Sequence, residues 1–295
     1  MSDRGLYHRK SEQKKHAKAI LAVPTAIIRL TGGVSVSPTM VTGARFIFCS
    51  DFMKPIGVFF VISQSETSNS KYSKMKVIVS DEIESVCPDF VGACVDAQVV
   101  NTAYSEGLWE EINLLGDTFR ATLTTETLKD QPGIAATRRV YRACGKDPSR
   151  YRPASEALIR RMLQGKSLYQ INTLVDLINL ASIKYGYSIG GFDAGKFAGD
   201  TLTLGVGRAG EPYEGIGRGP INIEGLPVYR DAQGGVGTPT SDNERTKIDM
   251  GTTHLIVLIN GYDGNEEHVR ANAEEIIRLV NAYCQGHDAS YKLFR

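Results

Sequence analysis

The sequence has few of the residues that build metal centres and disulfide frameworks. It holds five cysteines and five histidines among 295 residues, and no two cysteines have the CxxC spacing of a zinc or redox site. An odd number of dispersed cysteines is typical of free thiols in a reducing compartment. We therefore expect a cytoplasmic protein that uses neither a metal nor a cofactor.

Long apolar runs are also missing. The run AILAVPTAII is interrupted by Pro24 and followed by Arg29, whereas a membrane-spanning helix needs roughly 20 apolar residues without charge. Residues 1–74 end in SQSETSNSKYSK, a polar stretch that cannot bury surface. We therefore predict a poorly structured or misassigned extension over residues 1–74 and a folded domain over residues 75–295, with Met75 as its natural start. A targeting or membrane-associating leader is the alternative.

A large net charge is missing too, but the charge is unevenly distributed. The formal net charge is +1, and residues 1–74 hold eleven basic and four acidic residues, so residues 75–295 carry 23 basic and 29 acidic ones. Within this acidic part, residues 138–166 hold nine basic residues and only two acidic ones. Such a basic region can attract a phosphate backbone, or it can be a solvated helical face with local ion pairs.

The best-defined helix is expected to begin at Asn172. Apolar residues recur every three or four positions, and the polar pair Asp176 and Asn179 lies on one face of the same helix. We predict that a Gly-Gly turn follows and leads to Phe192 and Asp193. A polar pair beside an apolar stripe can line a pocket or can be the wet side of a core helix.

Other segments alternate between the two periodicities. Helical patterns occupy residues 105–128, 134–145, 157–165 and 264–284, and strand patterns occupy residues 75–79, 91–100, 200–207, 226–231 and 253–261. Helices gathered before and after a block of strands predict an α+β fold rather than a doubly wound sheet.

Two motifs invite a functional interpretation. Residues 205–210 read GVGRAG, but Glu211 and Pro212 follow where a dinucleotide-binding site needs a helix, so nucleotide binding is not favoured. Residues 237–246 read GTPTSDNERT, a loop whose hydroxyls and backbone can face a ligand or can stabilise its own turn.

Four strings carry a family resemblance: GKDPSRYRPASEALIRRML, INTLVDLINLASIKYGYSIGGFD, GEPYEGIGRGPINIEGLPVYRD and GTPTSDNERT. In this order they resemble a free-standing B3/B4 domain, which otherwise occurs in the β subunit of bacterial phenylalanyl-tRNA synthetase. The resemblance begins near Met75 and implies an α+β domain with layered β-sheets and flanking helices. In the synthetase this domain hydrolyses tyrosine wrongly attached to the phenylalanine tRNA.

The resemblance also implies where a pocket lies. Asn179 matches the pocket asparagine of the synthetase pattern, whereas Ile178, Gly190 and Gly237 stand where that pattern has threonine, histidine and glutamate. The implied pocket residues are Asn179, Gly190, Gly191, Asp193, Thr238, Thr240, Ser241 and Asn243. Three polar groups are replaced, so the catalytic residues are not identified and hydrolysis is in question.

Two functions remain open. One is a module that recognises aminoacyl-tRNA and edits mischarged tRNA in trans, in which the tRNA contacts are Arg138, Arg139, Arg142, Arg160 and Arg161. The other is a binding protein for an amino acid or another small molecule, without an RNA role. We expect no DNA or membrane partner, and no ATP-binding motif suggests a self-contained tRNA ligase.

Overall fold

The computed structural model describes residues 75–295, and the expectation for residues 1–74 lies outside them. One antiparallel sheet has the strand order β10-β2-β9-β3. Its strands are β2 (Val91–Gln98), β3 (Ile189–Asp193), β9 (His254–Gly261) and β10 (His287–Phe294). Strand β3 is therefore an edge of this sheet, with one side paired to β9 and the other side unpaired within the sheet.

A second sheet has the order β1-β4-β7-β8, in which β1 is parallel to β4 and the other pairs are antiparallel. Its strands are β1 (Lys76–Val79), β4 (Thr201–Val206), β7 (Pro227–Asp231) and β8 (Gly234–Gly237). A two-stranded ribbon of β5 (Glu214–Gly215) and β6 (Gly219–Pro220) lies in the long connection between β4 and β7.

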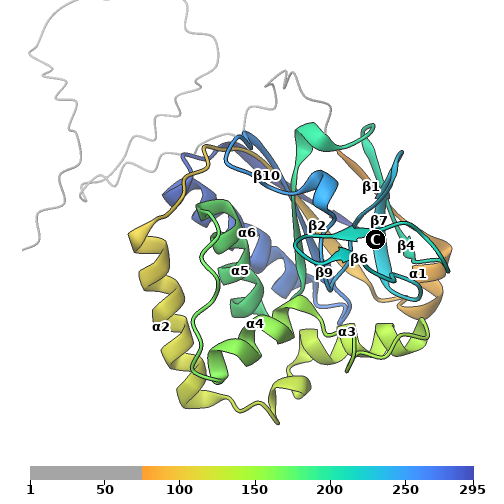
Figure 1. Cartoon of the computed structure of the whole chain (residues 1–295), viewed down its shortest axis with the longest axis horizontal. Helices are drawn as coiled ribbons and strands as arrows, with labels where there is room; N and C mark the ends of the chain where they lie inside the picture. Colours follow the sequence, from red (N-terminus) through yellow and green to blue (C-terminus); the bar gives the residue numbers. More distant parts are fainter. Residues whose placement is uncertain (1–74) are drawn as a thin grey trace, which may run out of the picture. The chain divides into compact units, whose positions relative to one another are not determined.

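The helices lie mainly on one side of the first sheet, as Figure 1 shows for α2, α4, α5 and α6. Their bounds are α1 (Asp81–Val86), α2 (Glu106–Thr122), α3 (Pro132–Ala143), α4 (Ala154–Leu163), α5 (Thr173–Tyr185) and α6 (Glu266–Tyr283). The core is divided accordingly, because successive side chains of a strand point to opposite faces. Leu255, Val257 and Ile259 pack against the helices, whereas Ile256 and Leu258 pack against the second sheet. This layered α+β arrangement confirms the expected fold class.

Helix α5 is confirmed with its predicted start. The side chain of Asn172 accepts a hydrogen bond from the backbone N–H of Val175 at 3.0 Å, which satisfies a free donor of the first turn. Gly186 ends the helix with a φ of 72°, a left-handed conformation that glycine adopts at little cost.

The predicted Gly-Gly turn is wrong, because Gly190 and Gly191 lie inside strand β3. The chain has already turned at Gly186, and the two glycines are needed for close packing instead. Strand β10 has no counterpart in the sequence prediction, since HDASYKLF has polar residues on both faces and its burial is only partial.

The four cysteines of the described part, Cys87, Cys94, Cys144 and Cys284, are free, as predicted. Cys49 lies outside the described residues. Between residues 75 and 295, no helix combines the length and the apolar character that a membrane crossing requires. The same residues contain no group of three or more His, Cys, Asp or Glu side chains placed to hold a metal ion.

Candidate functional site

The two glycines of β3 face opposite layers of the molecule. A Cβ atom on Gly191 would lie 2.4 Å from Cδ1 of Ile178, so this residue faces helix α5. A Cβ atom on Gly190 would lie 2.7 Å from the ring of Phe192 and 3.3 Å from Oδ1 of Asp242, on the side of the second sheet. Both positions therefore require a residue without a side chain.

The carboxylate of Asp242 occupies the space beside this strand. Its Oδ2 accepts a hydrogen bond from the backbone N–H of Gly191 at 3.2 Å. Its Oδ1 would lie 3.0 Å from a Cβ atom on Gly237, at the end of β8. The carboxylate thus lies between Gly190 and Gly237, two positions at which the sequence resemblance implies that a polar side chain is replaced.

No basic group neutralises this carboxylate. Among residues 75–295, Asp242 forms no ion pair, and the one hydrogen bond to its carboxylate comes from Gly191. Burial raises the pKa of Asp242 to about 7, against which the Gly191 hydrogen bond has only a partial effect. A carboxyl group with a pKa near neutrality can both accept and return a proton at physiological pH, which is the requirement for general acid–base catalysis.

The loop after β8 uses several of its predicted ligand groups to hold its own shape. The hydroxyl oxygen of Thr238 accepts hydrogen bonds from the backbone N–H groups of Thr240, at 3.3 Å, and Ser241, at 3.1 Å. The side chain of Asn243 accepts from the backbone N–H of Arg245 at 2.9 Å. Both Thr238 and Asn243 are buried, so they shape the loop around Asp242 rather than extend from it.

Two hydroxyl groups of the loop are more accessible. Thr240 and Ser241 are half-buried. The hydroxyl groups of Thr240 and Tyr141 lie 2.9 Å apart, which ties the loop to helix α3. The hydroxyl of Tyr213 donates to the backbone carbonyl of Ser241 at 2.7 Å. Two buried tyrosines therefore hold this part of the loop next to Asp242, one through the Thr240 hydroxyl and the other through the Ser241 carbonyl.

The two polar residues of α5 differ in their contacts: Asp176 has a structural role, whereas the side chain of Asn179 is not hydrogen-bonded within the described residues. Asp176 is buried and accepts hydrogen bonds from Nε1 of Trp109 at 2.9 Å and from the backbone N–H of Ile171 at 3.1 Å. Asn179 is half-buried, and its amide makes no hydrogen bond to any residue of the described chain. Its neighbour Ile178 packs on Gly191, on the helical side of the edge strand.

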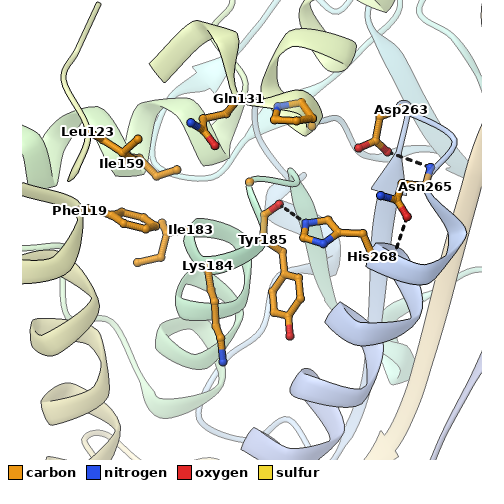
Figure 2. Close-up of a pocket in the computed structure, with 13 residues that line it drawn as sticks. Phe119, Leu123, Gln131, Ile159, Ile183, Lys184, Tyr185, Asp263, Asn265 and His268 are labelled. Carbon is orange, nitrogen blue, oxygen red and sulfur yellow. Dashed lines mark hydrogen bonds between the residues drawn. The ribbon is translucent and has the colours of Figure 1, made fainter. Parts of the chain in front are cut away.

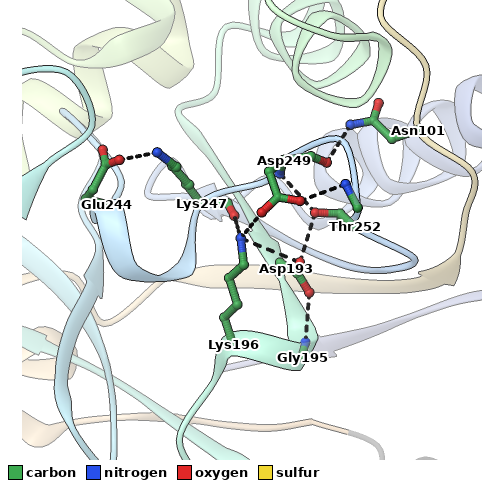
Figure 3. A network of polar contacts seen from close by, with 9 residues as sticks. Asn101, Asp193, Gly195, Lys196, Glu244, Lys247, Asp249 and Thr252 are labelled. Atoms are coloured by element: carbon green, nitrogen blue, oxygen red, sulfur yellow. Dashed lines mark hydrogen bonds and ion pairs between the residues drawn. The ribbon is translucent and has the colours of Figure 1, made fainter.

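Asp193 belongs to a different polar network, shown in Figure 3. Its carboxylate accepts hydrogen bonds from the hydroxyl of Thr252 at 2.9 Å and from the backbone N–H of Gly195 at 3.0 Å. Lys196 lies 3.7 Å from the same carboxylate and 2.6 Å from Asp249. These contacts hold the chain together after β3, and the structure does not bring Asp193 to the group around Asp242.

Three of the five predicted RNA-contacting arginines interact with protein groups. Arg138 pairs at 2.8 Å with Glu156, whose side chain is 2% exposed. Arg160 donates to the carbonyl of Thr125 at 3.2 Å. Arg161 donates to the hydroxyl of Tyr169 at 3.0 Å and its guanidinium lies over the same ring.

The other two arginines are solvent-exposed. Arg139 and Arg142 stand three positions apart on α3, so their side chains are neighbours on one face of the helix. Neither guanidinium has a hydrogen bond or an ion pair within the described residues. Arg139 and Arg142 are therefore the members of the predicted set whose charges remain available.

Two glycine motifs have structural roles. Gly207 of GVGRAG directly follows β4, where a Cβ atom would lie 2.0 Å from the carbonyl oxygen of Ile223, and a turn follows instead of a helix. Residues 186–190, GYSIG, have GxSxG spacing. However, Ser188 is fully buried and connects a helix to a strand, the reverse of a nucleophile elbow.

Asp242 is the residue that the sequence-based set omitted. The sequence resemblance implies that Gly190 and Gly237 replace polar residues, and in the folded chain the carboxylate of Asp242 lies beside both glycines. The sequence did contain a sign of this arrangement, because two glycines replace polar residues and the GTPTSDNERT loop carries one aspartate. Gly190, Gly237 and Asp242 come together only in the folded chain, because β3 pairs with β9 in the first sheet and β8 pairs with β7 in the second.

Comparison with known proteins relates residues 136–284 of the chain to a known domain family. Residues 136–284 match the sequence model of the B3/4 domain. An N-terminal fragment of the phenylalanyl-tRNA synthetase β-subunit from Pyrococcus horikoshii shares 14% identity with a TM-score of 0.37. The match covers 76% of this chain and 52% of that structure, so the chain spans about half of its length. No curated protein matches the chain. Because the matched region covers half of its residues, the chain belongs to the B3/4 domain family.

Proposed function

We propose that this chain recognises aminoacyl-tRNA and hydrolyses the ester of wrongly charged tRNA in trans, in the cytoplasm. The observation that carries the proposal is the unpaired carboxylate of Asp242, at the edge of β3 in a member of the B3/4 family. The aminoacyl end enters beside Gly190, next to Asp242 and the loop with Thr240 and Ser241, and Asn179 is the proposed contact on the helical side of β3. Arg139 and Arg142 contact the phosphate backbone.

In the proposed reaction, Asp242 acts as a general base. Its carboxylate accepts a proton from a water molecule as the water oxygen attacks the ester carbonyl carbon. The ester bond then breaks, the ribose oxygen takes the proton back, and the free amino acid leaves. Because only the deprotonated carboxylate accepts a proton, the rate is expected to rise with pH through about 7.

The test is a deacylation assay with tRNA carrying a wrong, isotopically labelled amino acid. The full chain is expected to release the amino acid faster than spontaneous hydrolysis, and Asp242→Asn to reduce that rate about 10²-fold or more. Asp200→Asn removes the same charge from an exposed position before β4 and serves as the matched control. Asn179→Ala and Thr240→Ala are expected to raise KM more than they lower kcat.

Absence of any acceleration across a panel of mischarged tRNAs would falsify the hydrolytic part of the proposal. Full activity in Asp242→Asn would remove the assigned base. Binding of tRNA is measured separately over a salt series, because phosphate contacts make affinity fall with increasing salt.

A second candidate function is a small-molecule binding module without an RNA role. It is favoured by the internal contacts of Arg138, Arg160 and Arg161, which reduce the basic surface available to a polyanion. This alternative predicts melting-temperature shifts with free amino acids and no salt-sensitive binding of tRNA. A flat response to an amino-acid panel would count against it.

A further inference from the structure

A cavity of about 310 Å³ lies among the helices and shares no lining residue with the group around Asp242. Figure 2 shows its walls, which come from the end of α2, the start of α3, the middle of α4, the end of α5 and the start of α6. A volume of this size is at the lower end of those that hold small organic ligands.

One end of the cavity is apolar. Figure 2 shows Phe119 and Leu123 of the α2 region beside Ile159 of α4 and Ile183 of α5. Phe119 and Leu123 are half-buried, whereas Ile159 and Ile183 are buried in the helical core. This end therefore offers a wall for a branched or aromatic group that would otherwise stay in water.

The other end carries a carboxylate, that of Asp263. This group accepts two contacts from the hydroxyl of Tyr187, at 2.8 and 3.0 Å, and one from the backbone N–H of Asn265 at 3.3 Å. All three contacts come from neutral donors. Within residues 75–295 no lysine, arginine or histidine lies at ion-pair distance from Asp263, which is itself half-buried.

The basic groups that line the cavity are already engaged. The ammonium of Lys184 pairs with Glu275 at 2.8 Å, and Figure 2 shows this side chain extending away from Asp263. Nε2 of His268 lies 2.9 Å from the backbone carbonyl of Tyr185 and must donate to it, because a carbonyl oxygen only accepts. The cavity therefore combines an apolar wall with one negative charge that lacks a cationic partner.

We propose that this cavity binds a small primary amine with an apolar body. The ammonium group pairs with Asp263, and the apolar body lies against Phe119, Leu123 and the two isoleucines. A charge-assisted hydrogen bond gives the ammonium its preference over a neutral group of the same shape. The site does not depend on the activity proposed above, because the two sets of lining residues are separate.

The primary test compares 3-methylbutylamine with its neutral analogue 3-methylbutan-1-ol by calorimetric titration into the full chain. The amine is expected to bind about tenfold more tightly or better, the factor that a hydrogen bond to a charged group supplies. Asp263→Asn should remove the preference for the amine while keeping the weak binding of the alcohol. Asp200→Asn, an equal change of charge at an exposed site outside this cavity, should retain the preference.

Methyl NMR of isoleucine-labelled protein locates the ligand without any substitution. The amine is expected to shift the methyl signals of Ile159 and Ile183. The proposal is overturned by the absence of saturable amine binding, by equal affinity for the amine and the alcohol, or by shifts confined to isoleucines outside the cavity.

A third arm separates two sources of the same chemistry. L-Leucinamide presents an ammonium and an apolar side chain without a carboxylate, and L-leucine adds the carboxylate. Binding of both ligands identifies free amino acids as occupants, whereas binding of leucinamide alone identifies amines and amino-acid derivatives. Binding of neither, with 3-methylbutylamine still bound, identifies simple amines without an amino-acid carbonyl as the occupants.

Discussion

Asp231 and Asp242 are close together in the sequence, but their carboxylates accept very different numbers of hydrogen bonds. Asp231 ends β7 and accepts hydrogen bonds from both terminal nitrogens of Arg245, at 2.8 and 2.9 Å, and from the backbone N–H groups of Ala198, Gln233 and Gly234. Asp242 accepts one, from Gly191. The two carboxylates therefore differ in how fully their hydrogen-bonding capacity is satisfied.

The pKa values follow these contacts. Burial alone would raise the pKa of Asp231, but the hydrogen bonds from Arg245 and the backbone outweigh it, and the pKa is lowered. At Asp242 only the single hydrogen bond from Gly191 acts against the effect of burial, and the pKa rises to about 7. A carboxylate that is fully satisfied stabilises a fold, whereas one left partly unsatisfied costs stability and retains its chemical reactivity. The comparison separates a structural aspartate from a candidate catalytic one.

The largest effect is expected from Asp231→Asn. The change leaves the guanidinium of Arg245 without its anionic partner and weakens a set of backbone contacts, at a cost of about 3–5 kcal/mol in the free energy of unfolding. Urea unfolding at pH 7 measures the loss, with Asp200→Asn as an exposed control. A loss below that of the control would show that the Arg245 pair contributes little.

The opposite sign is expected from Asp242→Asn at pH 8. The folded-state pKa of Asp242, about 7, exceeds the ordinary value of 3.8, so the folded protein binds more protons between these two pH values. Stability of the parent chain therefore falls as the pH rises from about 4 to about 7. Asparagine removes this dependence and should stabilise the fold by about 2–4 kcal/mol at pH 8 and by nothing at pH 4.

Unfolding curves of both proteins at a series of pH values provide this comparison. A difference that does not change with pH would mean that the carboxylate is already solvated in the folded state.

A smaller loss is expected from Gly237→Ala, which tests how closely the chain surrounds Asp242. The new Cβ would lie 2.5 Å from the ring of Phe192 and 3.0 Å from Oδ1 of Asp242, so both must move. Overpacking of this kind costs about 1–3 kcal/mol. The pH dependence assigned to Asp242 should also become smaller, because the carboxylate is displaced toward water.

Gly107→Ala is the matched control for that substitution. Gly107 lies in α2, where a Cβ would meet Tyr283 at an ordinary contact distance of 3.4 Å. Alanine there should stabilise the helix by about 0.5–1 kcal/mol, so the two Gly→Ala changes have opposite signs. Equal effects on stability would contradict the close packing around Gly237.

The local elements were largely predictable from the sequence, because their periodicity and end signals are local. Helix α5 begins after Asn172 and ends at Gly186 through contacts within a few residues. Strand β10 was not predictable, since its polar residues gain their place only by pairing with β2. Gly190 and Gly191 suggested a turn because a single sequence does not reveal the neighbours that exclude a side chain.

The candidate site was predictable only in outline for the same reason. Gly190 and Gly191 each lie beside the carboxylate of Asp242, which no local pattern distinguishes from Asp231. Asp193 and Arg138 looked equally functional in the sequence and prove to hold ion pairs. Charge and spacing identify candidates, and the long-range contacts decide which of them keep a free group.

The smallest effect on stability is expected from the double change Arg139→Gln and Arg142→Gln. Both side chains are exposed and unpaired within the described residues, so the free energy of unfolding should change by less than about 0.5 kcal/mol. Arg138→Gln is the contrasting variant, because it leaves the buried Glu156 with only Arg152, at 3.3 Å, and should cost about 1–3 kcal/mol.

Affinity for tRNA should reverse this order. Loss of two phosphate contacts makes the slope of log affinity against log salt shallower by about 1–2, which filter binding between low and moderate salt can measure. Arg138→Gln should leave that slope unchanged, since its guanidinium is held by Glu156. An unchanged slope in the double variant would place any RNA contact elsewhere and favour the small-molecule alternative, because the exposed charges of α3 would then serve no polyanion.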